Sequence, residues 1–471
     1  MKHLIIVLLW LTACTSQLPN PANVTSVTAV PTVDMTNPLV LCQTAQLRLR
    51  DWGQSITALQ ILIDRNLTCT SDTSLETQLY TAYLGYGTQL ERDGYRDAAQ
   101  DLYEAALQLN PDGLEAQERL IRMRGYFAPT VIPPANCDTD TVDEISAELP
   151  NYNPQKSDFV TLEDTGFVLN GESYPVYGVN YFPRDTPFHY FLTETDLEAV
   201  ETEMSLMQES GINTLRIFLY NTDLFICPDT NAIPITENVA RLDGVIRLAA
   251  EHNLRLIVVL NNDPDLLYHP LYSNPDSVQM QTRFIIERYH NEATILAWDI
   301  RDRGDADYRD DNFTREQVLT WVTETAIFIR EIDPNHLVTA GWWNNALDTA
   351  PLVDFVSFQF YGEYADFRQE IANLRASAGK PILLSAIGYS TFALDEIAQR
   401  NLLFQAFEEV AQNDLLGWIV YMAFDYPRTL TCIEPDCPGS GQAIDHYGIW
   451  NTSYFRKFAV DAVEIMTGVQ E

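Results

Sequence analysis

The feature that most restricts how this chain folds is a regular alternation of short apolar runs and longer amphipathic stretches, from about residue 160 to the C-terminus. This pattern is typical of a parallel sheet covered by helices. Helical periodicity is clear at residues 194–210, 315–332 and 396–412, but residues 345–350 are too short for a clear fifth helix. The expected strands are residues 177–180, 214–218, 255–260, 295–300, 337–340, 355–358, 382–384 and 417–421. Eight strands predict an α/β fold, a (β/α)8 TIM barrel.

Polar and aromatic residues recur where the predicted strands end, which is where barrels of this kind carry their active sites. Hydrogen-bonding side chains mixed with aromatic faces suit sugars. Any one of these aromatics alone is better explained by core packing, but their recurrence at one end favours a binding site. The residues predicted to bind the ligand are Asn180, Tyr181, Arg216, Asn261, Asp302, Trp342, Gln359, Tyr361 and Tyr421.

Four short motifs give the barrel a family resemblance. They are GVNYFP at residues 178–183, GINTLR at 211–216, WDI at 298–300 and KPILLS at 380–385. In this order, over about residues 160–468, the chain resembles the retaining glycoside hydrolases of clan A, the cellulase, mannanase and glucanosyltransferase type. The resemblance implies a cleft in which two carboxyl groups about 5–5.5 Å apart cleave a glycosidic bond.

The chain departs from that family at both catalytic positions. The family's fourth strand ends in Asn-Glu-Pro with Glu as the acid/base, and here Asp302, Arg303 and Gly304 stand instead. The nucleophilic Glu of the seventh strand is replaced by Ala386. An arginine stays protonated, and a methyl group cannot form a glycosyl ester. Of the other family positions, Arg216 and Tyr361 are retained, Gln359 replaces a histidine, and Tyr421 stands where tryptophan is common.

These departures predict a non-catalytic barrel, a pseudoenzyme that binds carbohydrate and needs no cofactor. The first alternative is an active O-glycosyl hydrolase with relocated carboxylates. If the alignment shifts by one residue, Arg301 takes the Asn position and Asp302 becomes the acid. An inverting pair, with its groups about 6.5–9.5 Å apart, then requires a partner such as Asp263, Glu363 or Asp425. The second alternative is a scaffold that binds partners through its helical repeats.

The charges that follow the fourth strand allow two interpretations. Arg301, Asp302, Arg303, Asp305 and Asp307 alternate in sign, so they can neutralise each other in a solvated loop. An arginine inside the cleft can also pair with a uronate or a sulfate on a sugar, because guanidinium and carboxylate form bidentate hydrogen bonds.

The N-terminus has the pattern of an export signal. A basic start is followed by an apolar run at residues 4–11, which is too short to span a bilayer, and then by Leu-Thr-Ala-Cys. This resembles the lipobox of bacterial lipoproteins, which implies a signal at residues 1–14, lipidation of Cys14 and anchoring on the bacterial cell surface or envelope. An ordinary signal peptide with an incidental cysteine is the alternative. Residues 15–37, rich in Thr, Pro, Asn and Val, predict a flexible tether.

Three regions follow the tether. Residues 38–126 carry small and aromatic residues at helix-face spacing and resemble tetratricopeptide repeats, which bind protein partners. A helical spacer is equally consistent with this pattern. Residues 127–158 contain prolines and acids without periodicity and predict a linker, and residues 159–471 form the barrel.

The net charge of −37 argues against nucleic acid and anionic lipid headgroups as partners. The membrane contact is therefore expected through the lipid alone. An even set of cysteines in an exported chain predicts disulfides with fifteen possible connectivities, and nothing suggests a metal site. Proximity in the sequence favours the pairs Cys42–Cys69, Cys137–Cys227 and Cys432–Cys437.

Overall fold

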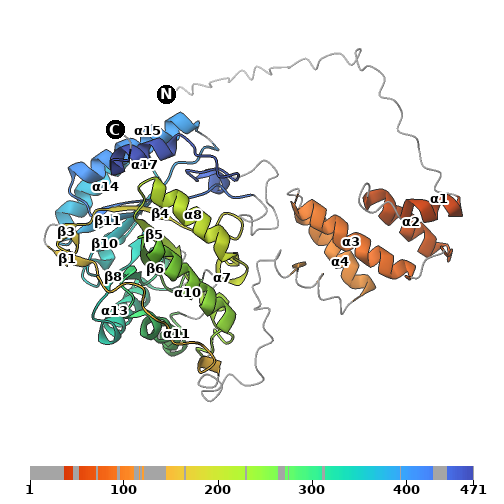
Figure 1. Cartoon of the computed structure of the whole chain (residues 1–471), viewed down its shortest axis with the longest axis horizontal. Coiled ribbons are helices and arrows are strands. Elements are labelled where there is room, and N and C mark those ends of the chain that lie inside the picture. The colour runs from red at the N-terminus through yellow and green to blue at the C-terminus, as the bar shows by residue number, and fades with distance from the viewer. Residues whose placement is uncertain are drawn as a thin grey trace, which may run out of the picture. The chain divides into compact units, whose positions relative to one another are not determined.

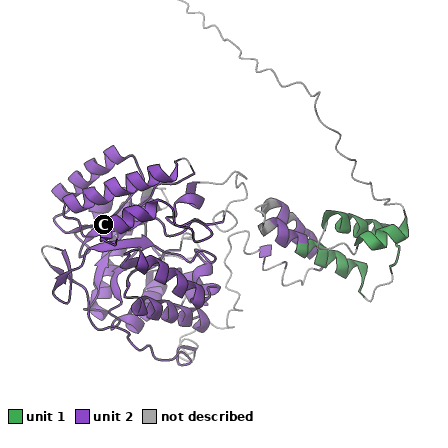
Figure 2. Ribbon diagram, turned by 45° about the horizontal axis from the view of Figure 1, so that its top comes forward, with its two compact units in different colours: residues 1–85 green, residues 86–471 purple. Residues whose placement is uncertain are grey.

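A computed structural model describes residues 37–45, 52–69, 73–92, 96–110, 116, 119–120, 145–163, 166–228, 231–263, 271–273, 275–309, 313–392, 394–427 and 443–469. The chain divides into two compact units, residues 1–85 and 86–471, coloured separately in Figure 2. Among the described residues, no helix is both long and apolar enough to cross a bilayer. The predicted lipidation site Cys14 and the cysteines 137, 432 and 437 lie outside the described residues. The predicted domain limits stay predictions.

The helices predicted within residues 38–126 are present in the described part of that range (Figure 1). Glycines let these helices approach aromatic rings: a Cβ on Gly85 would overlap the indole of Trp52, and one on Gly87 would overlap the ring of Tyr103. Tetratricopeptide identity and a protein partner stay predictions. The helices are α1 (Pro38–Ala45), α2 (Trp52–Asp64), α3 (Leu75–Arg92) and α4 (Arg96–Leu109).

One predicted disulfide is confirmed, because Cys42 and Cys69 are bonded to each other. Cys227 is also disulfide-bonded. Its predicted pairing with Cys137 stays a prediction.

The predicted TIM barrel is confirmed. All eight expected strands are present and parallel, and the fifth is divided into two short pieces around Ala340. One piece pairs with the fourth strand and the other with the sixth, so the sheet curls through all eight positions in the order β8-β7-β6-β5-β4-β12-β11-β10-β9. The strands are β4 (Val176–Asn180), β5 (Thr214–Phe218), β6 (Arg255–Val259), β7 (Ile295–Asp299), β8 (Leu337–Thr339), β9 (Gly341–Trp342), β10 (Val356–Phe360), β11 (Ile382–Ile387) and β12 (Gly417–Val420).

Helices follow most strands and cover the sheet from outside (Figure 1). Two of the three predicted helices have the expected bounds, and α13 begins with a capping box in which Thr314 and Gln317 satisfy each other's backbone amides. The weak fifth connection is a short 3-10 turn, as expected. The elements are α7 (Tyr190–Thr193), α8 (Leu197–Glu209), α9 (Asn221–Leu224), α10 (Thr236–Glu251), α11 (Pro275–Tyr289), α12 (Gly304–Arg309), α13 (Arg315–Ile332), η1 (Ala346–Thr349), α14 (Tyr364–Ser377), α15 (Glu396–Gln412), η2 (Ala443–His446) and α17 (Ala459–Thr467).

A small antiparallel sheet closes the N-terminal end of the barrel. It consists of β1 (Thr161–Glu163), β2 (Gly166–Leu169) and β3 (Glu172–Ser173), and it includes the predicted hairpin, with Asn170 and Gly171 both at positive φ. Phe167 packs edge to face on Phe355, with the ring centroids 5.1 Å apart. Ligands therefore reach the barrel from the opposite end, where the strands terminate.

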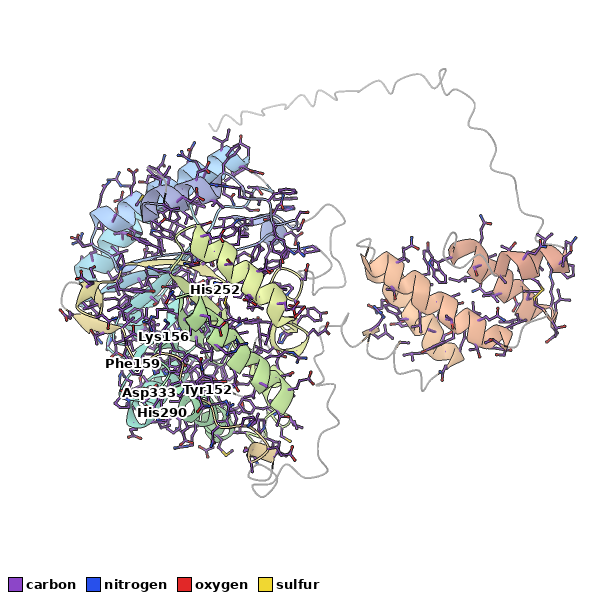
Figure 3. All side chains as sticks on the ribbon, in the orientation of Figure 1. Tyr152, Lys156, Phe159, His252, His290 and Asp333 are labelled. Atoms are coloured by element: carbon purple, nitrogen blue, oxygen red, sulfur yellow. A yellow bond between two sulfur atoms is a disulfide. The ribbon has the colours of Figure 1, made fainter. Side chains whose placement is uncertain are left out.

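The described end of the predicted linker is fixed to the barrel. Tyr152 Oη donates to Glu292 Oε2 at 2.7 Å, and the amide of Lys156 donates to the other oxygen at 3.2 Å. Phe159 then packs on His336. Figure 3 labels these segment residues on the barrel. A buried carboxylate, which sequence periodicity does not reveal, holds this irregular segment in place.

Candidate functional site

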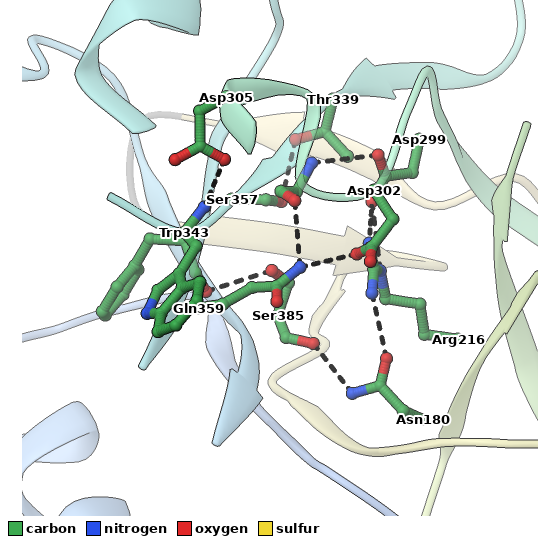
Figure 4. Close-up of polar contacts among 12 residues, drawn as sticks. Asn180, Arg216, Asp299, Asp302, Asp305, Thr339, Trp343, Ser357, Gln359 and Ser385 are labelled. Carbon is green, nitrogen blue, oxygen red and sulfur yellow. Dashed lines mark hydrogen bonds and ion pairs between the residues drawn. The ribbon is translucent and has the colours of Figure 1, made fainter. Parts of the chain in front are cut away.

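The C-terminal ends of four strands converge on one buried arginine (Figure 4). Arg216, from β5, donates from Nε and Nη2 to Asp299 Oδ2 at 3.0 and 2.7 Å. It also donates from Nη1 to Asn180 Oδ1 at 3.0 Å and from Nη2 to Asp302 Oδ1 at 2.6 Å. Four of its five N–H donors are therefore engaged. Gln359, from β10, completes the network by donating to Asp302 Oδ1 at 2.6 Å. We call these five residues the cleft floor.

The cleft floor keeps its charges because opposite charges face each other. The carboxylates of Asp299 and Asp302 raise the pKa of Arg216 further, although burial acts in the opposite direction. Burial raises the pKa of the Asp299 carboxyl above its ordinary value, and Arg216 only partly offsets this effect. The floor is a compensated ion-pair network at the base of the cleft.

Above the floor lies a cleft of roughly 440 Å³. One side is an aromatic wall of Trp343, Tyr361, Tyr421 and Tyr447, whose rings meet edge to face with centroids 5.5–5.7 Å apart. Burial raises the pKa of the Tyr361 and Tyr421 phenols above 10, so both stay neutral hydrogen-bond donors. The further described lining residues are Phe182, Phe188, Arg216, Phe218, Tyr220, Asn262, Asp302, Arg303, Gln359, Ala443 and Ile444.

The two positions that depart from the family pattern differ in exposure. Ala386, on β11, is 1% exposed and lies beside Gln359 in the β10–β11 register. Arg303 follows β7 with a left-handed φ of 50°, and its amide donates to the Gly341 carbonyl at 2.8 Å. Its guanidinium lies over the indole of Trp343, 5.1 Å from the ring centroid.

Most predicted binding residues gather here, but three lie in other surroundings. Trp342 is fully buried and not in the cleft, and a Cβ on Gly304 would lie 2.9 Å from its indole nitrogen. Asn261 is buried with a left-handed φ of 52°, and its neighbour Asn262 lines the cleft instead. Sequence reasoning missed Trp343, although it adjoins Trp342.

Tyr181 is the third of these residues. Its hydroxyl donates to Glu203 Oε2 at 2.8 Å, behind the cleft. Glu203 also accepts hydrogen bonds from Tyr454 Oη and from the amide of Arg184. Burial raises the pKa of Glu203 to about 7. Asn180 lies in the floor and not on the cleft surface, since its amide group bridges Arg216 and the carbonyl of Ser385.

The charged loop after β7 is paired, not merely solvated. Arg301 is buried and forms two hydrogen bonds with the Asp307 carboxylate, at 2.6 and 3.0 Å. Asp305 accepts the amides of Trp343 and Asn344. Together with the Arg216–Asp302 ion pair, these contacts engage the charged side chain of every member of the loop except Arg303.

The acids considered as partners of Asp302 have other structural contacts. Asp263 accepts the amides of Asn221 and Thr222 at 2.7 and 3.1 Å, and so fixes the start of α9. Asp425 pairs with the buried Lys457 at 2.6 Å. Glu363 is exposed at the start of α14. Among the described residues that line the cleft, Asp302 is the single acid. The described residues contain no group of three or more metal-ligating side chains.

Comparison with known proteins shows which proteins the barrel is similar to. Residues 175–380 match the family model described as Cellulase (glycosyl hydrolase family 5). Mannan endo-1,4-beta-mannosidase A of Hypocrea jecorina is 25% identical over 247 residues, which are 46% of this chain and 53% of that protein. Mannan endo-1,4-beta-mannosidase 1 of Arabidopsis thaliana is 26% identical over 40% of this chain and 51% of its own length. The chain spans about half the length of these curated relatives.

Solved structures share the fold. The GH5_18 protein of Streptomyces cattleya in complex with GlcNAc superposes with a TM-score of 0.55 and 15% identity, over 63% of this chain and 80% of that one. The endo-1,4-beta-mannanase of Rhizomucor miehei gives a TM-score of 0.50 and 20% identity, over 66% and 99%. The predicted resemblance to cellulase- and mannanase-type barrels is therefore confirmed.

Proposed function

We propose that this glycoside hydrolase family 5-like barrel binds a polysaccharide in its cleft without cleaving it. The relatives named as mannan endo-1,4-beta-mannosidases make β-1,4-linked mannan the first ligand to test. Binding, rather than catalysis, is the function that the remaining side chains support.

One observation carries this proposal: Asp302 is the single acid among the described cleft-lining residues. Retaining and inverting hydrolysis both need two carboxyl groups on either side of the scissile bond. Asp302 also accepts hydrogen bonds from Arg216 and Gln359 at 2.6 Å each, so one of its carboxylate oxygens is already engaged in the floor. The neighbouring positions 303 and 386 hold a cation and a methyl group.

The aromatic wall and the floor supply what a sugar-binding site needs. Tyr361, Tyr421 and Tyr447 offer ring faces and edges to the C–H surfaces of pyranose rings, and the phenols donate hydrogen bonds. The floor fixes the orientation of Gln359 and Asp302 before any ligand arrives, which reduces the entropy lost on binding.

The experiment combines binding and turnover on the full chain. Isothermal titration with mannohexaose and cellohexaose is expected to show binding of at least one of them, and incubation is expected to release no reducing sugar. Sugar release that disappears in the Asp302→Asn variant would overturn the non-catalytic proposal. No binding of any glycan, neutral or acidic, would overturn the binding proposal.

We further propose that Cys14 anchors the chain as an exported bacterial lipoprotein. The Leu-Thr-Ala-Cys sequence after a short apolar run supports this. In cells fed an alkyne-tagged fatty acid, the wild-type chain should carry the label in the membrane fraction. The Cys14→Ser variant should lose both label and membrane association, and label retained by that variant would contradict the proposal.

A further inference from the structure

Two arginines line the cleft, and they differ in how their N–H groups are used. Arg216 uses four of its five N–H donors on Asp299, Asp302 and Asn180. The ion pairs around Arg303 all join other residues, namely Arg216 with the two aspartates and Arg301 with Asp307. No described carboxylate pairs with Arg303, although it is exposed at the cleft and carries a full charge.

The indole of Trp343 orients this guanidinium without consuming its donors. Arg303 Cζ lies over the ring at 5.1 Å from the centroid, a cation–π distance, and this contact uses none of the N–H donors. The guanidinium of Arg303 forms no ion pair with a described residue, so its N–H groups stay available for a planar acceptor. The amide hydrogen bond of Arg303 to Gly341 fixes the turn from which the side chain starts.

The charge of the cleft is opposite in sign to that of the chain. The described lining residues include two arginines and one aspartate, a net charge of +1, whereas the whole chain carries −37. The Asp302 charge is largely offset by its contact with Arg216 at 2.6 Å. The positive charge of Arg303 acts to lower the pKa of the Tyr361 and Tyr421 phenols, although burial raises both pKa values overall. Arg303 is therefore close enough to interact with both rings of the aromatic wall.

From this geometry we propose that the cleft selects an acidic glycan and that Arg303 binds the carboxylate of a uronic acid residue. The inference rests on the carbohydrate-binding function proposed above and names its ligand class. A sugar ring stacked on the aromatic wall brings an equatorial or exocyclic carboxylate to the guanidinium at the cleft edge. A planar carboxylate can accept two parallel N–H bonds from this fork, and such bonds are about twice as strong as neutral ones.

Matched neutral and acidic oligosaccharides test this selection. Hexamannuronate differs from mannohexaose, and β-1,4-linked hexaglucuronate from cellohexaose, only by oxidation at C6. For at least one pair, the full chain is expected to bind the acidic member roughly 10- to 100-fold more tightly at low salt, as charge-assisted hydrogen bonds imply. Added salt should reduce this preference, because it screens the charge at the exposed cleft edge.

Variants of Arg303 separate charge from geometry. Arg303→Gln is expected to abolish the preference for the acidic member of each pair. Arg303→Lys should retain part of it, since lysine keeps the charge but not the fork. Arg247→Gln is the matched control, because Arg247 lies on α10 in an exposed ion pair with Glu251, away from the cleft. It should bind both members of each pair as the wild type does.

The outcomes distinguish this inference from the function on which it rests. Equal binding of neutral and acidic members, or a preference that survives Arg303→Gln, overturns the inference and leaves carbohydrate binding intact. Tighter binding of 6-sulfated mannohexaose than of hexamannuronate overturns the choice of a carboxylate. Absence of binding to every oligosaccharide removes the proposed function, and the inference with it.

Discussion

The cleft floor and the aromatic wall border the same cleft but differ in burial and in how their charges are paired. In the floor, the side chains of Arg216 and Asp299 are about 1% and 0% exposed and form an ion pair, so their charges neutralise each other inside the protein. At the wall, Arg303 is exposed and Trp343 is partly buried, and both line the cleft. The comparison teaches that the buried charges of the floor are compensated internally, whereas the charge of Arg303 forms no ion pair with a described residue.

The largest expected effect comes from removing the cation of the floor. Arg216→Met leaves Asp299 and Asp302 facing each other without compensation, and should lower the free energy of unfolding by about 3–5 kcal/mol. Urea denaturation followed by tryptophan fluorescence measures this loss. A companion variant, Arg216→Met with Asp299→Asn, should recover part of it. If Arg216→Met unfolded like the wild type, the floor would not be a stability element.

The adjacent residues Trp342 and Trp343 allow the buried core and the aromatic wall to be tested separately. Trp342→Ala removes a fully buried indole and should cost about 3 kcal/mol in unfolding free energy. Trp343→Ala should cost less than about 1 kcal/mol, since this ring is half-exposed, but it should weaken glycan binding measured by titration. The reverse pattern would contradict the placement of the two rings.

Glu203, which lies beside Tyr181 and Tyr454, predicts a pH dependence, because the nearby Arg184 only partly offsets the effect of burial on its pKa. Because burial raises its pKa to about 7 from an ordinary 4.5, the folded state holds this proton more tightly than the unfolded state. The wild type is therefore expected to lose stability as pH rises from 4.5 to 7, by up to about 3 kcal/mol from this group. Glu203→Gln should flatten that slope in denaturation curves taken across the range. An unchanged slope would refute the assignment.

The smallest effect is expected at Arg303. Arg303→Gln should change the unfolding free energy by no more than about 0.5 kcal/mol, because the side chain is exposed and joins no ion pair with a described residue. Thermal denaturation beside Arg216→Met gives the direct comparison. A large loss at Arg303 would mean that it belongs to the structure and not to the ligand site.

Much of the fold could be predicted because its signals are local. The eight strands, the Asn170-Gly171 hairpin and the short fifth connection each follow from the residues of one segment. The residues of the site were harder to predict where the strands end. Alternation assigns faces only while the backbone stays extended, so the left-handed turn at Asn261 sends Asn262 to the cleft. Likewise, at the end of β9, Trp342 is fully buried whereas Trp343 is only partly buried and lines the cleft.

The sequence by itself determined which chemistry is missing, because the residue at a strand end is a covalent fact: Arg303 and Ala386 cannot act as the two carboxyls of a retaining site. It also determined the barrel, through the order of apolar and amphipathic segments. Only the tertiary structure decided which charged side chains form ion pairs within the protein and which face the cleft. Arg216 and Asp302 stand 86 residues apart and meet at 2.6 Å, while Arg303, next to Asp302, is left facing the cleft. Pairing energies depend on distance and burial in space, and adjacency along the chain specifies neither.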